Sequence, residues 1–305
     1  MTITTPFHQD VRKDEQVDRR VDVQTDGRKA AGKDSGGLPP AGAFVIVLAN
    51  HKGGVTKTTS TANLGATFAE AGQRVLIVDC DPQANLSEAF GWVEELPGER
   101  LEDLLANPHA VAGRYTPPTA LQPDVAPGLE WRERLRIIPS TDALADVAAD
   151  LPVTGGQGYE LRLREVLEPL RERFDLVLLD TPPGLGPRSG MAVLAADGLL
   201  IPALAADLDV RGAGKLYDLV EGEIPGLRIL GVLLAASERR WRVTRDATDR
   251  MTADEMRVLP VQVPRAVRVA SAPRHRAPTV VLEPDSMVSH AYRQLAHHLL
   301  GELGR

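Results

Sequence analysis

The sequence predicts a single α/β domain with a mostly parallel, doubly wound sheet covered by helices on both faces. Six short apolar runs alternate along the chain with segments of helical periodicity, as strands buried in a parallel sheet do. A glycine-bearing segment with two lysines follows the first run, and carboxylates end two later runs. Ligands bind at such strand ends in open α/β sheets. No internal repeat is visible, so one domain accounts for the pattern.

Composition limits the class of protein. The chain has 305 residues, 43% of them hydrophobic, and a formal net charge of −7. The single Cys80 excludes a disulfide framework and cysteine-ligated metal sites. Every apolar run is shorter than the roughly 18 residues that a membrane-spanning helix needs, and the amino terminus lacks the apolar segment of a signal peptide. We therefore expect a soluble, cytoplasmic protein.

Residues 1–42 differ from the rest of the chain. They carry seven acidic and seven basic residues, few apolar ones, and a Gly- and Pro-rich end. Such a segment buries too little surface to offset the entropy of ordering it. We expect a disordered polar tail at 1–42 and the folded domain at 43–305. The tail is either a solvated extension or a segment that docks a partner or contacts DNA weakly.

The segment between the first apolar run, Phe44–Ala49, and the predicted helix Thr61–Glu70 has the context of a phosphate-binding loop. Backbone N–H groups of such a turn and of the helix that follows favour an anion. Lys57 supplies a positive charge for terminal phosphates, and the Thr58 hydroxyl is placed to hold Mg²⁺. Lysine is otherwise rare, with six lysines against 29 arginines, and Lys52 and Lys57 are two of the three beyond the tail. A compact ammonium is suited to a place between phosphates.

The standard phosphate-loop pattern fails at His51 and Thr56, where it requires glycine. The segment instead reads Lys52-Gly-Gly-Val-Thr-Lys-Thr-Thr59 and resembles the deviant Walker A motif of the ParA/MinD family of ATPases. In that family the first lysine is the signature residue. Because a β-branched residue disfavours positive φ, we expect Thr56 to avoid the left-handed region. The resemblance implies that the nucleotide is bound by Lys52, Gly53, Gly54, Val55, Thr56, Lys57, Thr58, Thr59, Pro264 and Arg265.

A second strand is predicted over residues 73–79, followed by Asp81, Pro82 and Gln83. The two carboxylates Asp79 and Asp81 are two residues apart, which in a strand places them on one face. By itself this pattern also fits a solvated turn. Asp-Pro-Gln resembles switch I of the same family, which implies that Asp81 positions or deprotonates the attacking water.

The middle of the chain is less regular. A possible helix near Leu101–Leu105, followed by five prolines, indicates an irregular excursion over residues 91–134. A strand is predicted at Leu135–Ser140 and a helix at Asp142–Asp150. Leucine and valine spacing over Leu161–Glu172 predicts an amphipathic helix despite Pro169.

Phe174–Asp180 is an apolar run that ends in a carboxylate, and Thr-Pro-Pro-Gly follows it. The run resembles a Walker B strand, and the Asp-Thr-Pro-Pro-Gly segment resembles the family's switch II, which senses the γ-phosphate. The resemblance implies that Thr58 and, through water, Asp180 hold Mg²⁺. Two further strands are predicted at Asp197–Pro202 and Leu227–Ala235, with a helix between them.

The carboxy-terminal part of the chain contains two arginine-rich segments, although the whole chain has a negative net charge. Residues 238–250 hold five arginines, and residues 256–282 hold five more and no acid. This is either a solvated arginine-rich surface or the footprint of phosphate-backbone binding. Val263–Pro273 is similar to a ParA segment that contributes to the adenine pocket and to non-specific DNA binding. The matching positions imply a nucleotide contact at Pro264 and DNA contacts at Arg265 and Arg268. The other candidates for DNA contact are Arg239, Arg240, Arg274 and Arg276.

The last predicted helix, Ser289–Gly301, is amphipathic, but its polar face offers one arginine and three histidines. That is too little positive charge for anionic lipid. It matches the closing core helix of ParA-like proteins, and we expect it in the core.

Taken together, the resemblance covers residues 44 to about 300 and implies an ATP-dependent DNA segregation protein of the ParA type, located with the nucleoid. It implies a homodimer closed over two molecules of ATP and Mg²⁺, with Lys52 reaching the partner's nucleotide. It also implies non-specific DNA binding, slow hydrolysis, and stimulation by a ParB-like centromere-binding protein. The alternatives are a MinD-like membrane-associated ATPase and an ATP-dependent amide ligase of the same fold.

Overall fold

The computed structural model describes residues 42–92, 99–111, 115–122, 128–154, 158–184, 186–204, 207–235, 241–264 and 275–305. The predicted tail lies outside them except for Gly42. Among the described residues, no helix is both long and apolar enough to span a membrane.

The six predicted apolar runs form the six strands of one sheet. All neighbouring strands are parallel, in the order β3-β2-β4-β1-β5-β6. Every residue of β1, β2, β4 and β5 is buried, as expected for a sheet covered on both faces. The predicted fold class is therefore confirmed. The strands are β1 (Phe44–Leu48), β2 (Val75–Asp79), β3 (Leu135–Ile138), β4 (Leu176–Asp180), β5 (Gly198–Ala203) and β6 (Arg228–Leu234).

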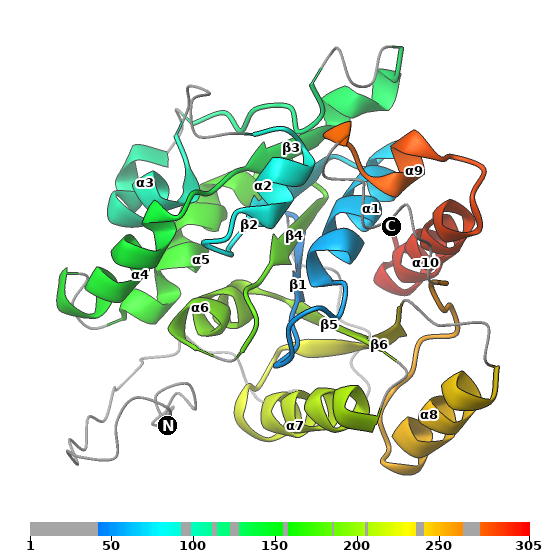
Figure 1. The fold of residues 1–305 in the computed structure, drawn as a ribbon. Coiled ribbons are helices and arrows are strands. Elements are labelled where there is room, and N and C mark those ends of the chain that lie inside the picture. Colours follow the sequence, from blue (N-terminus) through cyan, green and yellow to red (C-terminus); the bar gives the residue numbers. More distant parts are fainter. Residues whose placement is uncertain are drawn as a thin grey trace, which may run out of the picture.

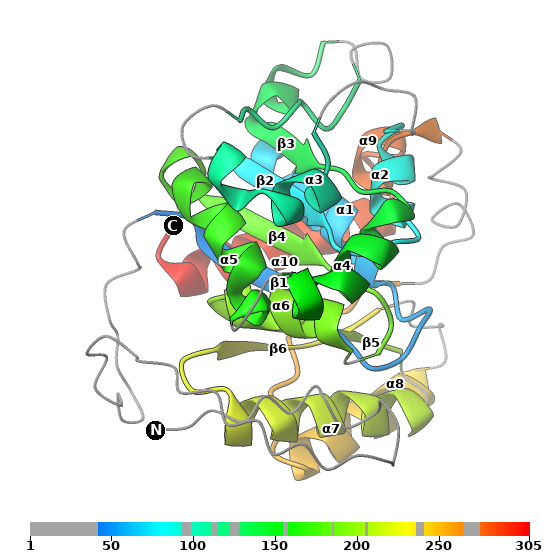
Figure 2. The same cartoon turned by 90° about the vertical axis from the view of Figure 1, so that its left-hand side faces the viewer.

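Two hydrophobic cores lie on the two faces of the sheet, because successive side chains of a strand point to opposite faces. Val45 and Val47 of β1 belong to one core, and Phe44, Ile46 and Leu48 belong to the other. The helices of the first face are α3 (Leu101–Ala106), α4 (Ala143–Thr154), α5 (Arg162–Leu167), α6 (Pro187–Ala195), α7 (Asp207–Glu223) and α8 (Trp241–Ala253). Those of the second face are α1 (Lys57–Glu70), α2 (Asn85–Ala89), α9 (Thr279–Leu282) and α10 (Met287–Leu303). Figure 1 shows α1 and α10 on the opposite side of the strands from α4 and α5, and in Figure 2 α4, α5 and α6 lie in front of the sheet.

The prediction of one continuous helix over Leu161–Glu172 is wrong. The chain instead forms a 3₁₀ turn at Tyr159–Leu161, the short helix α5, and a second 3₁₀ segment at Glu168–Arg173. Pro169 lies at the beginning of that second segment, and proline has no N–H group to continue an α-helical ladder. The excursion before β3 is irregular as predicted, with α3 and 3₁₀ segments at Pro108–Val111 and Glu130–Arg134.

The last helix lies in the core as predicted. Nine residues of α10 are buried, and α10 packs along α1. Its first turn is capped by Ser286, whose hydroxyl accepts a hydrogen bond from the N–H of Ser289, and its last turn ends at Gly304 in the left-handed conformation. The apolar face that a membrane-binding helix would need is therefore occupied by contacts within the domain.

The register of the central strands brings three distant segments together. Leu48 at the end of β1 is opposite Asp180 at the end of β4, and Asp79 at the end of β2 is opposite Asp180 on the other side. Because the strands are parallel, the segments that follow them leave the sheet at the same edge. The glycine-bearing loop, the Asp-Pro-Gln segment and the Asp-Thr-Pro-Pro-Gly segment therefore meet at one place.

Candidate functional site

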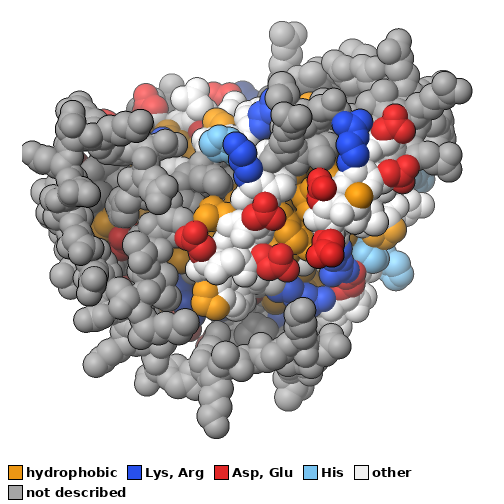
Figure 3. Space-filling model, turned by 90° about the horizontal axis from the view of Figure 1, so that it is seen from below, with side chains coloured by type: hydrophobic (Ala, Val, Ile, Leu, Met, Phe, Trp, Pro, Cys, Tyr) orange, Lys and Arg blue, Asp and Glu red, His pale blue; other side chains and the backbone are white. Residues whose placement is uncertain are grey.

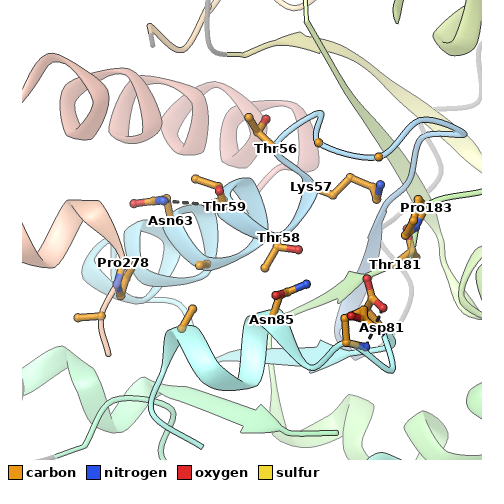
Figure 4. Close-up of a pocket in the computed structure, with 16 residues that line it drawn as sticks. Thr56, Lys57, Thr58, Thr59, Asn63, Asp81, Asn85, Thr181, Pro183 and Pro278 are labelled. Atoms are coloured by element: carbon orange, nitrogen blue, oxygen red, sulfur yellow. Dashed lines mark hydrogen bonds between the residues drawn. The ribbon is translucent and has the colours of Figure 1, made fainter. Parts of the chain in front are cut away.

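A pocket of about 500 Å³ opens at this edge of the sheet, a size that suits a small organic ligand. Its lining residues come from the loop before α1, from α1 itself, and from the segments after β2 and β4, together with two residues before α9 (Figure 4). They are Gly53, Gly54, Thr56, Lys57, Thr58, Thr59, Ala62, Asn63, Asp81, Gln83, Asn85, Ala89, Thr181, Pro183, Ala277 and Pro278. Most of the predicted loop residues are therefore in the wall of one pocket.

Lys57 is the first residue of α1 and is 6% exposed. In Figure 4 its side chain extends toward Thr181 and Pro183. Its Nζ donates a hydrogen bond of 3.1 Å to the carbonyl of Lys52. Burial lowers the pKa of Lys57, while Asp180 and Asp81 raise it. The ammonium is thus held in the pocket wall next to carboxylates, at the beginning of a helix whose N–H groups favour an anion.

Lys52 is exposed, but its backbone is held by hydrogen bonds on both sides. Its N–H donates to Oδ1 of Asn50 at 3.1 Å, and its carbonyl accepts from Lys57. Asn50 is fully buried and donates from Nδ2 to the carbonyl of Pro202 at the end of β5. The carbonyl of His51 accepts from the N–H of Gly184. The loop is therefore fastened to β5 and to the segment after β4.

The expectation for Thr56 is wrong. This residue has φ 70° and ψ 20°, in the left-handed region, where Gly54 also lies with φ 74°. A left-handed β-branched residue costs roughly 1–2 kcal/mol. The surrounding contacts hold it there: the Thr56 carbonyl accepts from the N–H of Ser60, and its hydroxyl lies 3.5 Å from the Ser60 hydroxyl. The tight entry into α1 requires a left-handed residue even where the sequence does not supply glycine.

Three carboxylates gather at the pocket, one in its wall and two behind it. Asp79 and Asp180 are fully buried, and Asp81 is 6% exposed. Burial raises the pKa of Asp180 well above its ordinary value, Asp79 adds to the rise, and the nearby Thr58 hydroxyl opposes it. The positive charge of Lys57 also lowers this pKa. If all three carboxyl groups were ionised, Lys57 would offset only part of their negative charge, which is costly for buried groups.

Asp79 and Asp81 have different surroundings, contrary to the expectation that they share one face. Asp81 lines the pocket. The Asp79 carboxylate is instead bound by the segment that follows β2, through the N–H of Asp81 and through the N–H and hydroxyl of Ser87. Burial raises the pKa of Asp79 to about 6, although these hydrogen bonds lower it.

The residues fit a magnesium ion. The Oδ2 atom of Asp180 is buried and has no hydrogen-bond partner among the described residues, while its Oδ1 accepts from the hydroxyl of Thr61 at 3.4 Å. The Thr58 hydroxyl lies in the pocket wall. Within the described part of the chain, no group of three or more His, Cys, Asp or Glu side chains is arranged to bind a metal by itself. This suits Mg²⁺, which takes few protein ligands and keeps water and phosphate oxygens.

The other end of the pocket contains residues that the sequence did not indicate. Asn63 donates from Nδ2 to the carbonyl of Thr59 at 2.8 Å and accepts at Oδ1 from the N–H of Val280 at 3.0 Å. It therefore joins α1 to α9 and sets the position of Pro278 in the pocket wall. The sequence signal that could have indicated Asn63 is its position one helical turn after Thr59, on the same face of α1. Pro264 is half-buried and is not among the described residues that line the pocket.

Of the six arginines predicted to contact DNA, the structure describes one. Arg239, Arg240, Arg265, Arg268 and Arg274 lie outside the described residues. Arg276 is exposed and directly precedes the pocket residues Ala277 and Pro278. Its φ is 55°, in the left-handed region. Its side chain lies beside Gly91, two residues after α2.

The surface formed by α7 and α8 carries exposed acids. They are Asp218, Glu221 and Glu223 of α7 and Asp246 and Asp249 of α8. Figure 3 shows this side of the molecule, where Asp and Glu side chains are interspersed with Lys and Arg side chains. Among side chains of α8 that the structure places, Arg250 is the one arginine. The described part of this face is therefore no continuous basic surface.

Comparisons with known proteins agree with this geometry. Residues 43–224 match the protein family described as AAA domain. The chromosome-partitioning ATPase Soj of Thermus thermophilus is 35% identical over 269 residues, which cover 85% of this chain and 96% of that protein.

Solved structures share the fold over most of the chain. An ATP complex of a variant of Cyanothece McdA is 26% identical with a TM-score of 0.69, covering 86% of this chain and 97% of that one. Cobyrinic acid a,c-diamide synthase of Mycobacterium smegmatis, with bound ADP and magnesium, is 27% identical with a TM-score of 0.68 and the same coverage. The fold thus occurs both in that synthase and in McdA.

Proposed function

We infer the function from the premise that this chain belongs to the ParA/Soj family of partitioning ATPases. It is an ATPase, and its cofactors are ATP and Mg²⁺. The observation that carries the assignment of the site is the meeting of Lys57, Thr58 and Asp81 in one pocket beside Oδ2 of Asp180, which has no hydrogen-bond partner in the described part of the chain. We propose that the triphosphate lies along the loop before α1 and that the base lies toward Pro278.

Each site residue then has a chemical role. Lys57 would bind the β- and γ-phosphates, since its ammonium is already desolvated and held at the beginning of α1. Thr58 would bind Mg²⁺ directly and Asp180 through water, so that the cation offsets the buried carboxylates. Asp81 would orient or deprotonate the attacking water. Catalysis would come mainly from positioning and from stabilising charge on the transferred phosphoryl group.

We propose that hydrolysis requires a second copy of the chain. Lys52 lies at the exposed front of the loop, and its backbone is fixed by Asn50 and Lys57. Held in this way, its side chain would extend to the nucleotide of a partner subunit and add positive charge to the transition state. Lys52→Ala is expected to abolish ATP-dependent dimerisation, which light scattering or analytical ultracentrifugation would detect. A normal dimer of this variant would refute the role across the interface.

We further propose non-specific DNA binding through the acid-free arginine segment, residues 256–282. The exposed acids of α7 and α8 would repel a phosphate backbone, so we place the DNA-binding surface at Arg265, Arg268, Arg274 and Arg276 rather than on that face. Arg239 and Arg240 remain candidates for DNA contact. Closing the dimer would join two weak DNA surfaces into one of higher avidity. Affinity should then fall steeply with salt as counterions are released.

Release from DNA would follow hydrolysis. We propose that a ParB-like centromere-binding protein stimulates the slow basal reaction, so that the bound nucleotide times how long the dimer stays on the nucleoid. The test is a DNA retardation assay with ATP, ADP or no nucleotide at two salt concentrations. Retardation with ATP alone, weakened at the higher salt, is the expected result. Binding that does not depend on the nucleotide would overturn the proposal.

A further inference from the structure

We propose that Asp79, Ser87 and Ser140 are positioning residues that hold Asp81 in place for hydrolysis. The proposal rests on the role proposed above for Asp81. None of the three residues lines the pocket. Each would affect hydrolysis by holding the backbone of Asp81.

Asp81 is held by its main chain on both sides. Its N–H donates to Oδ1 of Asp79 at 3.1 Å, and its carbonyl accepts from the Ser140 hydroxyl at 3.1 Å. One carboxylate oxygen, Oδ1, accepts from the N–H of Gln83 at 3.0 Å. The other oxygen, Oδ2, accepts no hydrogen bond from the described residues. The residue is therefore fixed in position while one oxygen stays available to a water molecule.

The two groups that hold Asp81 are themselves joined through Ser87. The N–H and hydroxyl of Ser87 donate to Oδ2 of Asp79 at 2.8 and 2.7 Å. The Ser87 hydroxyl in turn accepts from the N–H of Ser140 at 3.0 Å. The hydrogen bonds thus form a closed ring that runs from Asp81 to Asp79, Ser87 and Ser140 and returns to Asp81.

The ring is buried and connects three elements. Asp79 and Ser87 are fully buried and Ser140 is 1% exposed. Asp79 ends β2, Ser87 lies in α2, and Ser140 follows β3. A hydrogen bond to a charged group is worth more than one between neutral groups, and Asp79 accepts three of them. This arrangement restrains the segment between β2 and α2 from both ends.

Restraint of this kind matters for a group that must act on a bound water. A displacement of about 1 Å at a catalytic group can cost on the order of 100-fold in rate. Removing a residue that orients a functional group through a hydrogen bond typically lowers activity 10- to 100-fold. Nucleotide binding, by contrast, depends on the loop before α1 and on Lys57, none of which takes part in the ring.

The test is steady-state ATP hydrolysis and equilibrium ATP binding by the full chain. Ser140→Ala removes one hydroxyl and keeps the Ser140 N–H that binds Ser87, so it is the least disruptive variant. We expect kcat to fall about 10- to 100-fold, with ATP affinity changed less than about twofold. Ser140→Thr, which restores a hydroxyl, should recover most of the rate. Ser87→Ala and Asp79→Asn should lower kcat at least as much.

Thr67→Val is the matched control. Thr67 is buried in α1, and its hydroxyl donates to the carbonyl of Asn63 at 2.9 Å. This substitution removes the same kind of buried bond outside the ring, so it should lower thermal stability without lowering kcat. If Ser140→Ala has the same effect as Thr67→Val, a folded protein with an unchanged kcat, the positioning role is refuted.

The variant Asp81→Ala distinguishes a failure of the positioning role from a failure of the catalytic role proposed for Asp81. If Asp81→Ala loses hydrolysis while Ser140→Ala keeps it, the catalytic role of Asp81 stands and the ring has no role in positioning it. If Asp81→Ala hydrolyses ATP normally, both proposals fall. If both variants lose activity, adding Ser140→Ala to Asp81→Ala should cause no further loss, because the serine acts through the aspartate.

Discussion

The hydroxyl groups of Ser60 and Tyr292 lie 3.1 Å apart, although 232 positions separate them in the chain. Ser60 is in the first turn of α1, and Tyr292 is in α10. Both are at most 1% exposed, and burial raises the pKa of Tyr292 to about 12. The helix that follows the phosphate-binding loop is thereby joined to the last helix of the domain.

Loss of this bond should destabilise the fold. Tyr292→Phe removes one hydroxyl and leaves the Ser60 hydroxyl with only the 3.5 Å contact to Thr56. We expect the free energy of unfolding to fall by about 1–2 kcal/mol, measured by urea denaturation. Ser60→Ala should cost a similar amount, and the double variant less than the sum. Strictly additive losses would show that the two hydroxyls do not interact.

Thr56→Gly should stabilise the protein. Glycine adopts the left-handed conformation of this position without the roughly 1–2 kcal/mol cost of a side chain, although its greater freedom in the unfolded chain offsets part of the gain. We expect a higher thermal midpoint and nearly unchanged hydrolysis. Thr56→Val, which keeps the branched shape and loses the hydroxyl, is the control and should be less stable than either. A lower midpoint for Thr56→Gly would mean that the contact with Ser60 outweighs the strain.

Arg276→Gly should change stability and DNA binding in opposite directions. The position has φ 55°, so glycine relieves strain, and the loss of one positive charge weakens DNA binding if Arg276 contacts a phosphate. We expect higher thermal stability, and a slope of log affinity against log salt that is smaller by about 1. Arg257→Gln removes the same charge from an exposed arginine that pairs with Glu302 and should leave this slope unchanged. Equal effects of the two substitutions would mean that only the net charge matters.

The pair of Arg74 and Asp175 should make stability depend on pH in acid. Both precede strands of the sheet at the edge opposite the pocket, and their side chains lie 2.8 Å apart. The hydrogen bond from Arg74 lowers the pKa of Asp175 from its ordinary value of 3.8. A carboxyl group whose pKa is lower in the folded state stabilises the fold above the unfolded pKa, and this stabilisation is lost as the pH falls through the folded value.

We therefore expect Arg74→Gln to be less stable than the unmodified chain at pH 7 and at pH 5. The difference should shrink below about pH 4, as Asp175 becomes protonated in both proteins. Urea midpoints at pH 7, 5 and 3.5 measure this, and hydrolysis at pH 7 should be unaffected. A constant difference at all three pH values would contradict the assignment, because a packing effect does not titrate. The effect should be modest, since Arg74 is half-exposed to solvent.

The sequence by itself determined the six strands, because a fully buried parallel strand needs a continuous apolar run and these runs are present in the chain. It also determined the loop before α1 and the position of Asp180 at the end of β4, since each follows directly from a local pattern. The placement of α10 in the core followed from its apolar stripe and scarce positive charge.

Only the tertiary structure decided how these parts act on one another. The left-handed conformation of Thr56 depends on how the loop enters α1, and the separation of Asp79 from the pocket depends on its hydrogen bonds to Asp81 and Ser87. Ser140 joins this group from a segment 59 positions beyond Asp81. Local propensity carries no information about such partners. The sequence therefore identifies which residues could bind a nucleotide, and the folded chain decides which of them reach it and which hold the others in place.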